Sequence, residues 1–179
     1  DRSGLKLNNV TITYDTDNGP LETVRDISLS ILPGEIYGLV GESGSGKTTI
    51  ARAIVRYLAE NGRISSGTIS LDGTDLTEKS KSEMRRMWGS RITMVHQDPN
   101  QAINPSMTIG KQIAEMARIH LGHGRTDAYD KAVAMLSWVR MPDPERVARR
   151  FAHQLSGGQL QRVLIAIALI TNPHLLIMD

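Results

Sequence analysis

The chain has 179 residues, of which 40% are hydrophobic and 22% are charged, and these proportions are ordinary for a globular protein. Its formal net charge of +2 is too small to indicate a nucleic-acid-binding surface, so we expect no nucleic-acid partner. It contains no cysteine, which excludes disulfides and cysteine-ligated metal centres. No apolar run reaches about 18 residues, so we expect any membrane association to come through a partner.

The first part of the chain predicts strands. Residues 5–14 and 24–32 alternate apolar and polar side chains, as half-buried antiparallel strands do. Residues 15–20 form a turn cluster between them. The short apolar run 36–40 predicts a buried parallel strand. Apolar residues then recur at helical spacing over 49–58, which predicts a helix.

The sequence GESGSGKTT joins this strand to this helix. It fills the pattern G-x-x-x-x-G-K-[ST] with Gly41, Gly46, Lys47 and Thr48. Glycines let successive backbone N–H groups converge on an anion, and the lysine supplies a mobile positive charge for the β- and γ-phosphates. The threonine hydroxyl suits Mg²⁺. A glycine-rich turn that binds nothing is the alternative, but the strand before and the helix after favour a phosphate site at a helix N-terminus.

Two short strands and a short helix are predicted after this helix. Residues 67–71 and 91–95 predict short strands. Met84, Met87 and Trp88 predict a short helix that packs on a core.

Two helices are predicted in the next region. One begins after Thr108, a suitable N-cap. The other opens at Thr126 and ends at Pro142. The cluster Arg146, Arg149 and Arg150 lies beside acidic residues and predicts a solvated helix face.

A second anion site is predicted at LSGGQ, which is Leu155, Ser156, Gly157, Gly158 and Gln159. The serine is a good N-cap for the helix that follows, and the glycines leave the helix start bare enough for a phosphate to approach. The first loop already holds one nucleotide, so we infer that this second site reaches a nucleotide held by another chain. An ordinary serine-capped helix is the alternative.

These motifs together resemble the nucleotide-binding subunits of ATP-binding-cassette (ABC) transporters. Residues 41–49 resemble the Walker A motif and 155–159 the family signature. Residues 175–179 resemble Walker B, and 96–99 the Q-loop. Tyr14 falls where the family places an aromatic side chain that stacks on adenine.

A narrower resemblance is to the peptide/nickel import branch. It rests on Gln97-Asp98-Pro99, then 103–105 (INP), 107–110 (MTIG) and 153–159 (HQLSGGQ) followed by 161–163 (QRV). His96 departs from this branch, whose members usually carry an aromatic or apolar residue there.

The resemblance implies an α/β fold. This fold has a P-loop NTPase core with an N-terminal antiparallel β-subdomain and an inserted helical subdomain. We expect residues 1–106 to form the core with its β-subdomain, 107–154 the helical subdomain, and 155–179 the signature helix and the Walker B strand.

The resemblance also implies the roles of the site residues. Lys47, Gln97 and Asp179 would be catalytic, and Thr48, Gln97 and Asp179 would hold Mg²⁺. Leu155 to Gln159 would act in trans. The ATP-binding set would be Tyr14, Gly41, Glu42, Ser43, Gly44, Ser45, Gly46, Lys47, Thr48 and Thr49. The alternatives are that Tyr14 packs on a core and that Asp179 caps a turn.

The implied function is ATP hydrolysis that powers import of peptides or nickel. The partners would be a second ATPase subunit, transmembrane permease subunits and, indirectly, an extracytoplasmic substrate-binding protein, at the cytoplasmic face of the plasma membrane. The family places a glutamate directly after the Walker B aspartate, and this sequence ends at Asp179, so we expect a piece of a longer protein. A nucleotide-binding module without hydrolysis, and an ATPase of a soluble assembly such as a phosphonate-degrading lyase complex, remain alternatives.

Overall fold

The structure is a computed structural model that describes residues 4–95 and 98–179, without the side chains of Asn100 and Gln101. The chain divides into two compact units, Asp1–Arg86 and Met87–Asp179, which we describe separately. The predicted residues His96 and Gln97 lie outside the described part of the chain.

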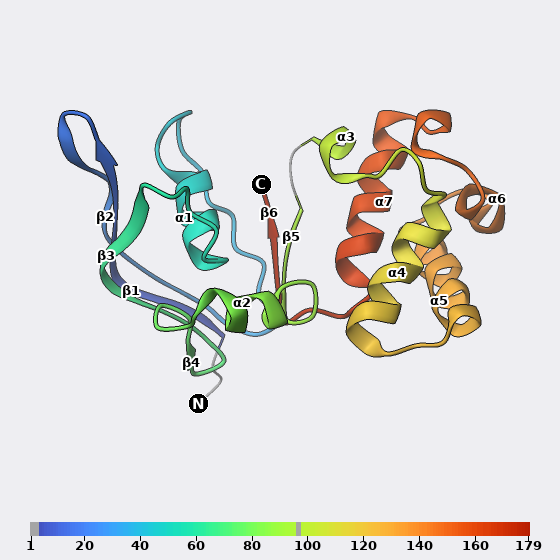
Figure 1. The fold of residues 1–179 in the computed structure, drawn as a ribbon, viewed down its shortest axis with the longest axis horizontal. Coiled ribbons are helices and arrows are strands. Elements are labelled where there is room, and N and C mark those ends of the chain that lie inside the picture. Colours follow the sequence, from blue (N-terminus) through green and yellow to red (C-terminus); the bar gives the residue numbers. More distant parts are fainter. Residues whose placement is uncertain (1–3, 96–97) are drawn as a thin grey trace. The chain divides into compact units, whose positions relative to one another are not determined.

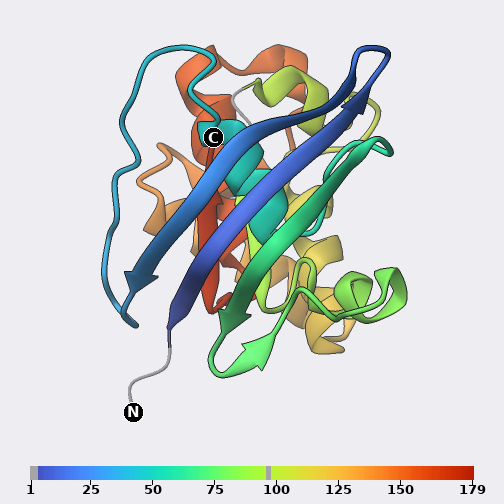
Figure 2. The ribbon, with the colours of Figure 1, turned by 90° about the vertical axis from the view of Figure 1, so that its left-hand side faces the viewer.

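The first unit is built on a four-stranded antiparallel sheet with the order β2-β1-β3-β4 (Figure 2). The strands are β1 (Leu5–Thr16), β2 (Gly19–Ile31), β3 (Gly62–Leu71) and β4 (Thr74–Asp75). The predicted strands 5–14 and 67–71 are thereby confirmed as parts of longer strands, and 24–32 is confirmed up to Ile31, where β2 ends.

One face of this sheet carries the core of the first unit. Along β1, Leu5, Leu7, Val10 and Ile12 are buried, which is the alternation that the sequence predicted. Helix α1 (Lys47–Ile54) contacts β1, β2 and β3 and buries Ile50, Ala53 and Ile54. The periodicity that predicted this helix is therefore the face that packs on the sheet.

The predicted strand at 36–40 is wrong. These residues form no strand, and Ile36 and Val40 are 98% and 94% exposed. A strand is stabilised by a hydrogen-bonded neighbour, and this run pairs with no strand in the described chain. The apolar composition of the run was therefore not sufficient to make it a strand.

The helix predicted at 49–58 ends earlier in the structure than the sequence indicated. Helix α1 stops at Ile54 because Arg56 adopts a left-handed conformation, with φ of 56°, and Tyr57 donates its backbone N–H back to Arg52 O at 2.8 Å. The next helix, α2 (Lys81–Met87), carries the buried side chains of Met84 and Met87, as the sequence predicted.

The second unit is mainly helical (Figure 1). Its helices are α3 (Pro99–Ala102), α4 (Ile109–Leu121), α5 (Arg125–Trp138), α6 (Pro144–Ala148), the 3₁₀ turn η1 (Ala152–Gln154) and α7 (Gly157–Leu169). Thr108 is the N-cap residue of α4, as predicted, although its side chain makes no capping hydrogen bond. Helix α5 begins at Arg125 with Gly124 as its cap, just before the predicted Thr126.

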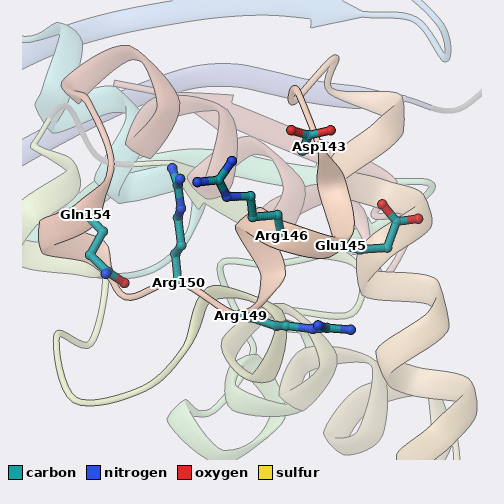
Figure 3. Close-up of a pocket in the computed structure, with 6 residues that line it drawn as sticks. All are labelled: Asp143, Glu145, Arg146, Arg149, Arg150 and Gln154. Carbon is teal, nitrogen blue, oxygen red and sulfur yellow. The ribbon is translucent and has the colours of Figure 1, made fainter.

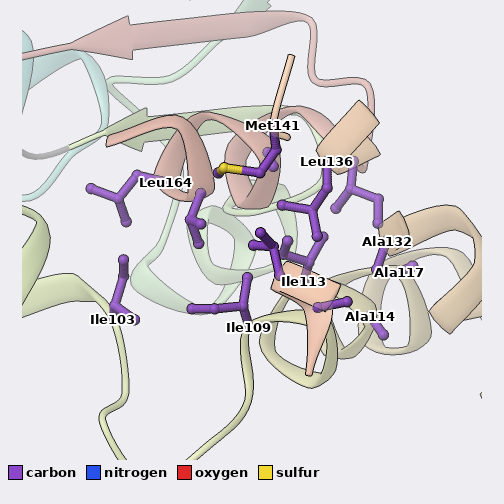
Figure 4. Close-up of a cluster of buried hydrophobic side chains, with 14 of the residues drawn as sticks. Ile103, Ile109, Ile113, Ala114, Ala117, Ala132, Leu136, Met141 and Leu164 are labelled. Carbon is purple, nitrogen blue, oxygen red and sulfur yellow. The ribbon is translucent and has the colours of Figure 1, made fainter. Parts of the chain in front are cut away.

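A cluster of buried apolar side chains joins α4, α5 and α7 (Figure 4). Ile109, Ile113, Leu136 and Val163 are fully buried in it. Full burial of a side chain of this size stabilises the fold by about 1.5–3 kcal/mol. This cluster is the core that fixes the position of α7.

The same unit contains a pair of parallel strands, β5 (Ile92–Val95) and β6 (Leu175–Met178). Both strands were predicted. Their registers place Val95 beside Met178, so the carboxyl ends of the two strands lie together.

Candidate nucleotide-binding site

The loop before α1 turns tightly on its glycines. Gly44 and Gly46 have φ of 81° and 89°, a left-handed conformation that favours glycine. A Cβ atom on Gly41 would lie 2.7 Å from Ser45 Oγ, so the two ends of the turn touch. The backbone N–H of Ser45 donates to Glu42 O at 3.2 Å across it. The loop therefore holds a conformation that side chains at these glycines would disrupt.

Helix α1 begins without a side-chain cap. Gly46 is its N-cap residue, and a glycine has no side chain that could cap the first turn. No acidic residue lies in that turn either. The first N–H groups of a helix need an acceptor, and the helix dipole favours a negative one. An incoming phosphate can meet this need directly.

Lys47 is the first residue of α1, and its side chain folds back over the loop. Its Nζ donates to Gly41 O at 2.7 Å, to Glu42 O at 2.6 Å and to Ser45 Oγ at 3.2 Å. These acceptors are neutral oxygens. A phosphate oxygen carries a negative charge and makes a stronger hydrogen bond with an ammonium group. The lysine is thus held beside the loop in a place from which it can turn to an anion.

Tyr14 lies near the end of β1 and is half-buried. Its ring lies against Gly62 on β3, because a Cβ atom there would be 2.6 Å from Tyr14 Cε1. The loop touches the neighbouring strand, since a Cβ atom on Gly46 would be 3.0 Å from Val24 Cγ2. Val24 pairs with Ile12, two residues before the tyrosine. The tyrosine and the loop therefore belong to one unit: Tyr14 is on β1, and the loop touches β2, the strand paired with β1.

Asp179 lies in the second unit, directly after β6. Its backbone N–H donates to Val95 O at 3.0 Å, at the carboxyl end of β5. Ligands of open α/β sheets bind at the carboxyl ends of the strands. Gln97, two residues beyond Val95, is outside the described residues, so its predicted role is not tested by the structure.

The LSGGQ sequence forms the start of α7. Ser156 is the N-cap residue, and its Oγ accepts a hydrogen bond from Gln159 N at 3.4 Å. Gln159 Oε1 accepts in turn from Ser156 N at 3.0 Å, which completes a capping box. Gly157 and Gly158 are exposed, and a Cβ atom on either would meet nothing within 4 Å. The predicted N-cap is confirmed, and the space beside the two glycines is open.

The structure thus places the predicted residues in two sets. Tyr14 and Gly41 to Thr49 lie in the first unit; Leu155 to Gln159 and Asp179 lie in the second. Among the described residues, no group of three or more His, Cys, Asp or Glu side chains could hold a metal ion by itself.

Sequence reasoning missed Gln112, a buried polar residue on α4. Its side chain accepts from Asn104 N at 2.9 Å and donates to Asn104 O at 2.8 Å and to Met107 O at 2.9 Å. It therefore fixes the segment 103–107, which carries part of the resemblance to the import branch. The available signal was a glutamine three residues after the buried Ile109, on the apolar side of the helix.

The predicted arginine cluster lines a surface cavity of about 680 Å³ (Figure 3). Arg146 and Arg149 are exposed, as are the acidic residues Asp143 and Glu145 beside them. The prediction of a solvated helix face is confirmed for these residues. Within residues 4–95 and 98–179 no helix has the length and hydropathy that would let it cross a bilayer.

Comparisons with known proteins agree with this geometry. The oligopeptide transport ATP-binding protein OppD of Salmonella typhimurium is 37% identical over 175 residues, which are 98% of this chain and 52% of that protein. OppD of Mycobacterium tuberculosis is 42% identical over 176 residues, 98% of this chain and 29% of that protein. The chain spans about half of the Salmonella relative and less of the mycobacterial one.

Solved structures show the same fold. The ATP-binding cassette MJ0796, in a dimeric post-hydrolysis state bound to ADP and Pi, aligns with a TM-score of 0.84 and 27% identity over 98% of this chain and 73% of that chain. CbiO1 of Clostridium perfringens, part of the transporter complex cbiONQ, aligns with a TM-score of 0.80 and 24% identity over 100% of this chain and 66% of that chain. The fold is the α/β P-loop NTPase fold of these cassettes.

The family comparison covers most of the chain. The model of the family described as "ABC transporter" matches residues 24–179, which include the glycine-rich loop, the start of α7 and the end of β6. The chain therefore belongs to the ABC transporter family.

Proposed function

We propose that this chain is the nucleotide-binding part of an ATPase subunit that powers the import of peptides. The observation that carries this proposal is the start of α1, where a tight glycine turn with a glycine N-cap is followed by Lys47, whose ammonium group lies over the loop. Peptides are the proposed cargo because the matched relatives are named as oligopeptide transport proteins. Nickel is the alternative cargo.

The phosphates of ATP would lie on the loop from Gly41 to Thr49. Lys47 would leave Gly41 O and Glu42 O for the β- and γ-phosphates, because charged oxygens are better acceptors than carbonyls. Tyr14 would stack on the adenine ring. The two ends of the nucleotide would then be held by one unit.

The chain's residues suit Mg²⁺, a cation that prefers oxygen ligands and keeps several waters. Thr48 would offer its hydroxyl, and Asp179 and Gln97 would reach the ion directly or through water. The ion would neutralise charge that develops on the transferred phosphoryl group. We further propose residues 1–106, 107–154 and 155–179 as the core, the helical subdomain and the returning segment of this fold.

The start of α7 would act on a nucleotide held by a second subunit. Ser156 and the free N–H groups of Gly157 and Gly158 would cap its γ-phosphate. Two subunits would thus enclose two ATP molecules, and the closing and opening of this pair would drive transmembrane permease subunits. The chain would then lie at the cytoplasmic face of the plasma membrane as a peripheral subunit, with a substrate-binding protein outside.

Lys47→Ala tests this proposal. We expect the variant to lose ATP-dependent association, because the phosphates lose their main positive charge. Association is measured by analytical ultracentrifugation with and without Mg-ATP, and ATP binding by calorimetric titration. Lys131→Ala is the control, since Lys131 is an exposed lysine on α5. A Lys47→Ala variant that still associates with ATP like the parent would show that the loop is not the nucleotide site.

A further inference from the structure

Helix α5 ends in a Schellman motif whose left-handed residue is an arginine. Arg140 has φ of 57°, and its N–H donates to Ser137 O at 2.9 Å. Met141 N donates to Leu136 O at 2.9 Å, which is the second hydrogen bond of this motif. A glycine is the usual residue at the left-handed position, so an arginine there carries some backbone strain.

The additional contact comes from α7. An Nη of Arg162 donates to Arg140 O at 2.6 Å. A cation is favoured near the C-terminus of a helix, where carbonyl groups lack partners, and a charged donor makes a stronger hydrogen bond than a neutral one. The α7 side chain therefore binds the backbone at the end of α5.

Met141 adds an apolar contact at the same place. Its side chain is 4% exposed and lies in the buried cluster with Leu136 and Leu164 (Figure 4). The end of α5 thus meets α7 twice, through Met141 in the core and through Arg140 O at the surface. We name these three residues, Arg140, Met141 and Arg162, the α5–α7 latch.

The two contacts reach α7 beside one another. Val163 and Ala166 lie on the face that packs in the core, and Arg162 precedes Val163 by one residue, roughly 100° around the helix. The charged hydrogen bond at the edge of the packed face adds a directional contact to the apolar one, and the two together oppose rotation of the helix about its axis. Ser156 is six residues before Arg162, roughly 9 Å along the axis at about 1.5 Å per residue.

We propose that Arg162 is a positioning residue for the start of α7. The latch fixes how far α7 protrudes and which way Gly157 and Gly158 face, and these glycines carry the N–H groups left open by the capping box. This inference rests on the proposed function, in which those groups bind a nucleotide of a second subunit. Arg162 itself contacts no nucleotide in this proposal.

Residue-resolved amide exchange tests the latch without nucleotide. In Arg162→Gln we expect Gln159 and Leu160, whose N–H groups bond Ser156, to exchange at least threefold faster than in the parent. Arg149→Gln removes an exposed arginine outside the latch and should leave both rates unchanged. A change confined to residues 139–142 would overturn the proposal, because the loss would then be local to α5.

A second measurement separates positioning from binding. Arg162→Gln should bind ATP within twofold of the parent but associate roughly tenfold more weakly in Mg-ATP. Arg162→Lys keeps a donor for Arg140 O and should recover at least half of the loss; a lysine variant no better than glutamine would overturn the donor role. Unchanged association of Arg162→Gln would also overturn the proposal. A parent that does not associate with ATP would instead refute the proposed function, and the exchange experiment would still decide the latch.

Discussion

The starts of α1 and α7 are both rich in glycine, but they satisfy their N–H groups differently. Helix α1 has the left-handed Gly46 as its cap, a residue with no side chain to accept a hydrogen bond. Helix α7 has Ser156, whose Oγ accepts from Gln159 N, and the Gln159 side chain bonds back to Ser156 N. One helix start therefore depends on backbone conformation, and the other on a reciprocal pair of side chains.

In the proposed function, this difference separates two kinds of anion site. A helix start whose cap residue has no side chain gains more from an external acceptor, so α1 would hold an anion with help from Lys47. A capped start has already met part of its need and would offer the Ser156 hydroxyl and the N–H groups of Gly157 and Gly158. Such a site would add a contact to a ligand that is held elsewhere.

Gly46→Ala should give the largest effect, because the α1 start depends on this conformation. A Cβ atom at Gly46 would sit 3.0 Å from Val24 Cγ2 and 3.4 Å from Thr23 O, at φ of 89°. We expect ATP affinity, measured by calorimetric titration, to fall about 100-fold, or about 2.8 kcal/mol.

Gly122→Ala is the matched control for this variant. Gly122 ends α4 at φ of 69° with nothing within 4 Å of its Cβ position, so it shares the backbone strain but not the loop. Its ATP affinity should equal that of the parent. An equal loss of affinity in both variants would show that general destabilisation, and not the loop, causes the effect.

Ser156→Ala should give the next largest effect, on stability. The variant removes the acceptor of Gln159 N and opens the capping box. We expect the free energy of unfolding, from urea denaturation, to fall by about 1 kcal/mol. Ser137→Ala, on the exposed surface of α5, should cost nothing measurable. Equal stability of Ser156→Ala and the parent would mean that the box does not hold α7.

Gly158→Ala should give a smaller effect. It should raise the stability of the fold and weaken the association of two chains. Its Cβ atom would meet nothing within 4 Å, and alanine is the better helix former. We expect the free energy of unfolding to rise by about 0.5 kcal/mol. Association in Mg-ATP, measured by ultracentrifugation, should weaken, because the methyl group obstructs the N–H groups. Association that strengthens along with stability would contradict the role of this surface.

The smallest effect is expected at α2, which has a charged form of the α7 capping box. Glu83 Oε2 accepts from Ser80 N at 2.8 Å and from Ser80 Oγ at 2.7 Å, and Lys79 Nζ lies 3.1 Å from Oε1. The backbone hydrogen bond from Ser80, then its hydroxyl and Lys79, lower the pKa of Glu83 from 4.5 to about 2.

A lowered carboxyl pKa stabilises the folded state above the unfolded value and loses that contribution as pH falls from 4.5 through about 2. Glu83→Gln should therefore flatten the dependence of the thermal midpoint on pH in this window, whereas Gln159→Glu should introduce a dependence at α7. Identical pH profiles for parent and Glu83→Gln would show that protonation of Glu83 does not affect the stability of the folded state.

The features that the sequence predicted well are those set by neighbours along the chain. Ser156 as N-cap and the loop before Lys47 each depend on residues three to five positions apart, and so do the helices after Thr108 and at LSGGQ. Helical and capping preferences act over this distance, so the residue pattern was sufficient. The strands 91–95 and 175–178 also emerged from local apolar runs.

The features that the sequence did not predict depend on partners far along the chain. The run 36–40 is as apolar as 92–95, but only the latter has a hydrogen-bonded neighbour in the described chain. Gln112 looks like any helix glutamine until its three bonds to the 103–107 segment are known. Composition alone does not say which segment finds a partner.

The sequence by itself determined the family, the glycine-rich turn before Lys47 and the capped start of α7, because glycine, lysine and serine act there through the backbone of their own segment. Only the tertiary structure decided that Arg162 reaches Arg140 O, that Tyr14 lies against Gly62, and that Asp179 lies beside Val95. These contacts join residues distant along the chain, and their existence depends on packing that brings helices and strands together.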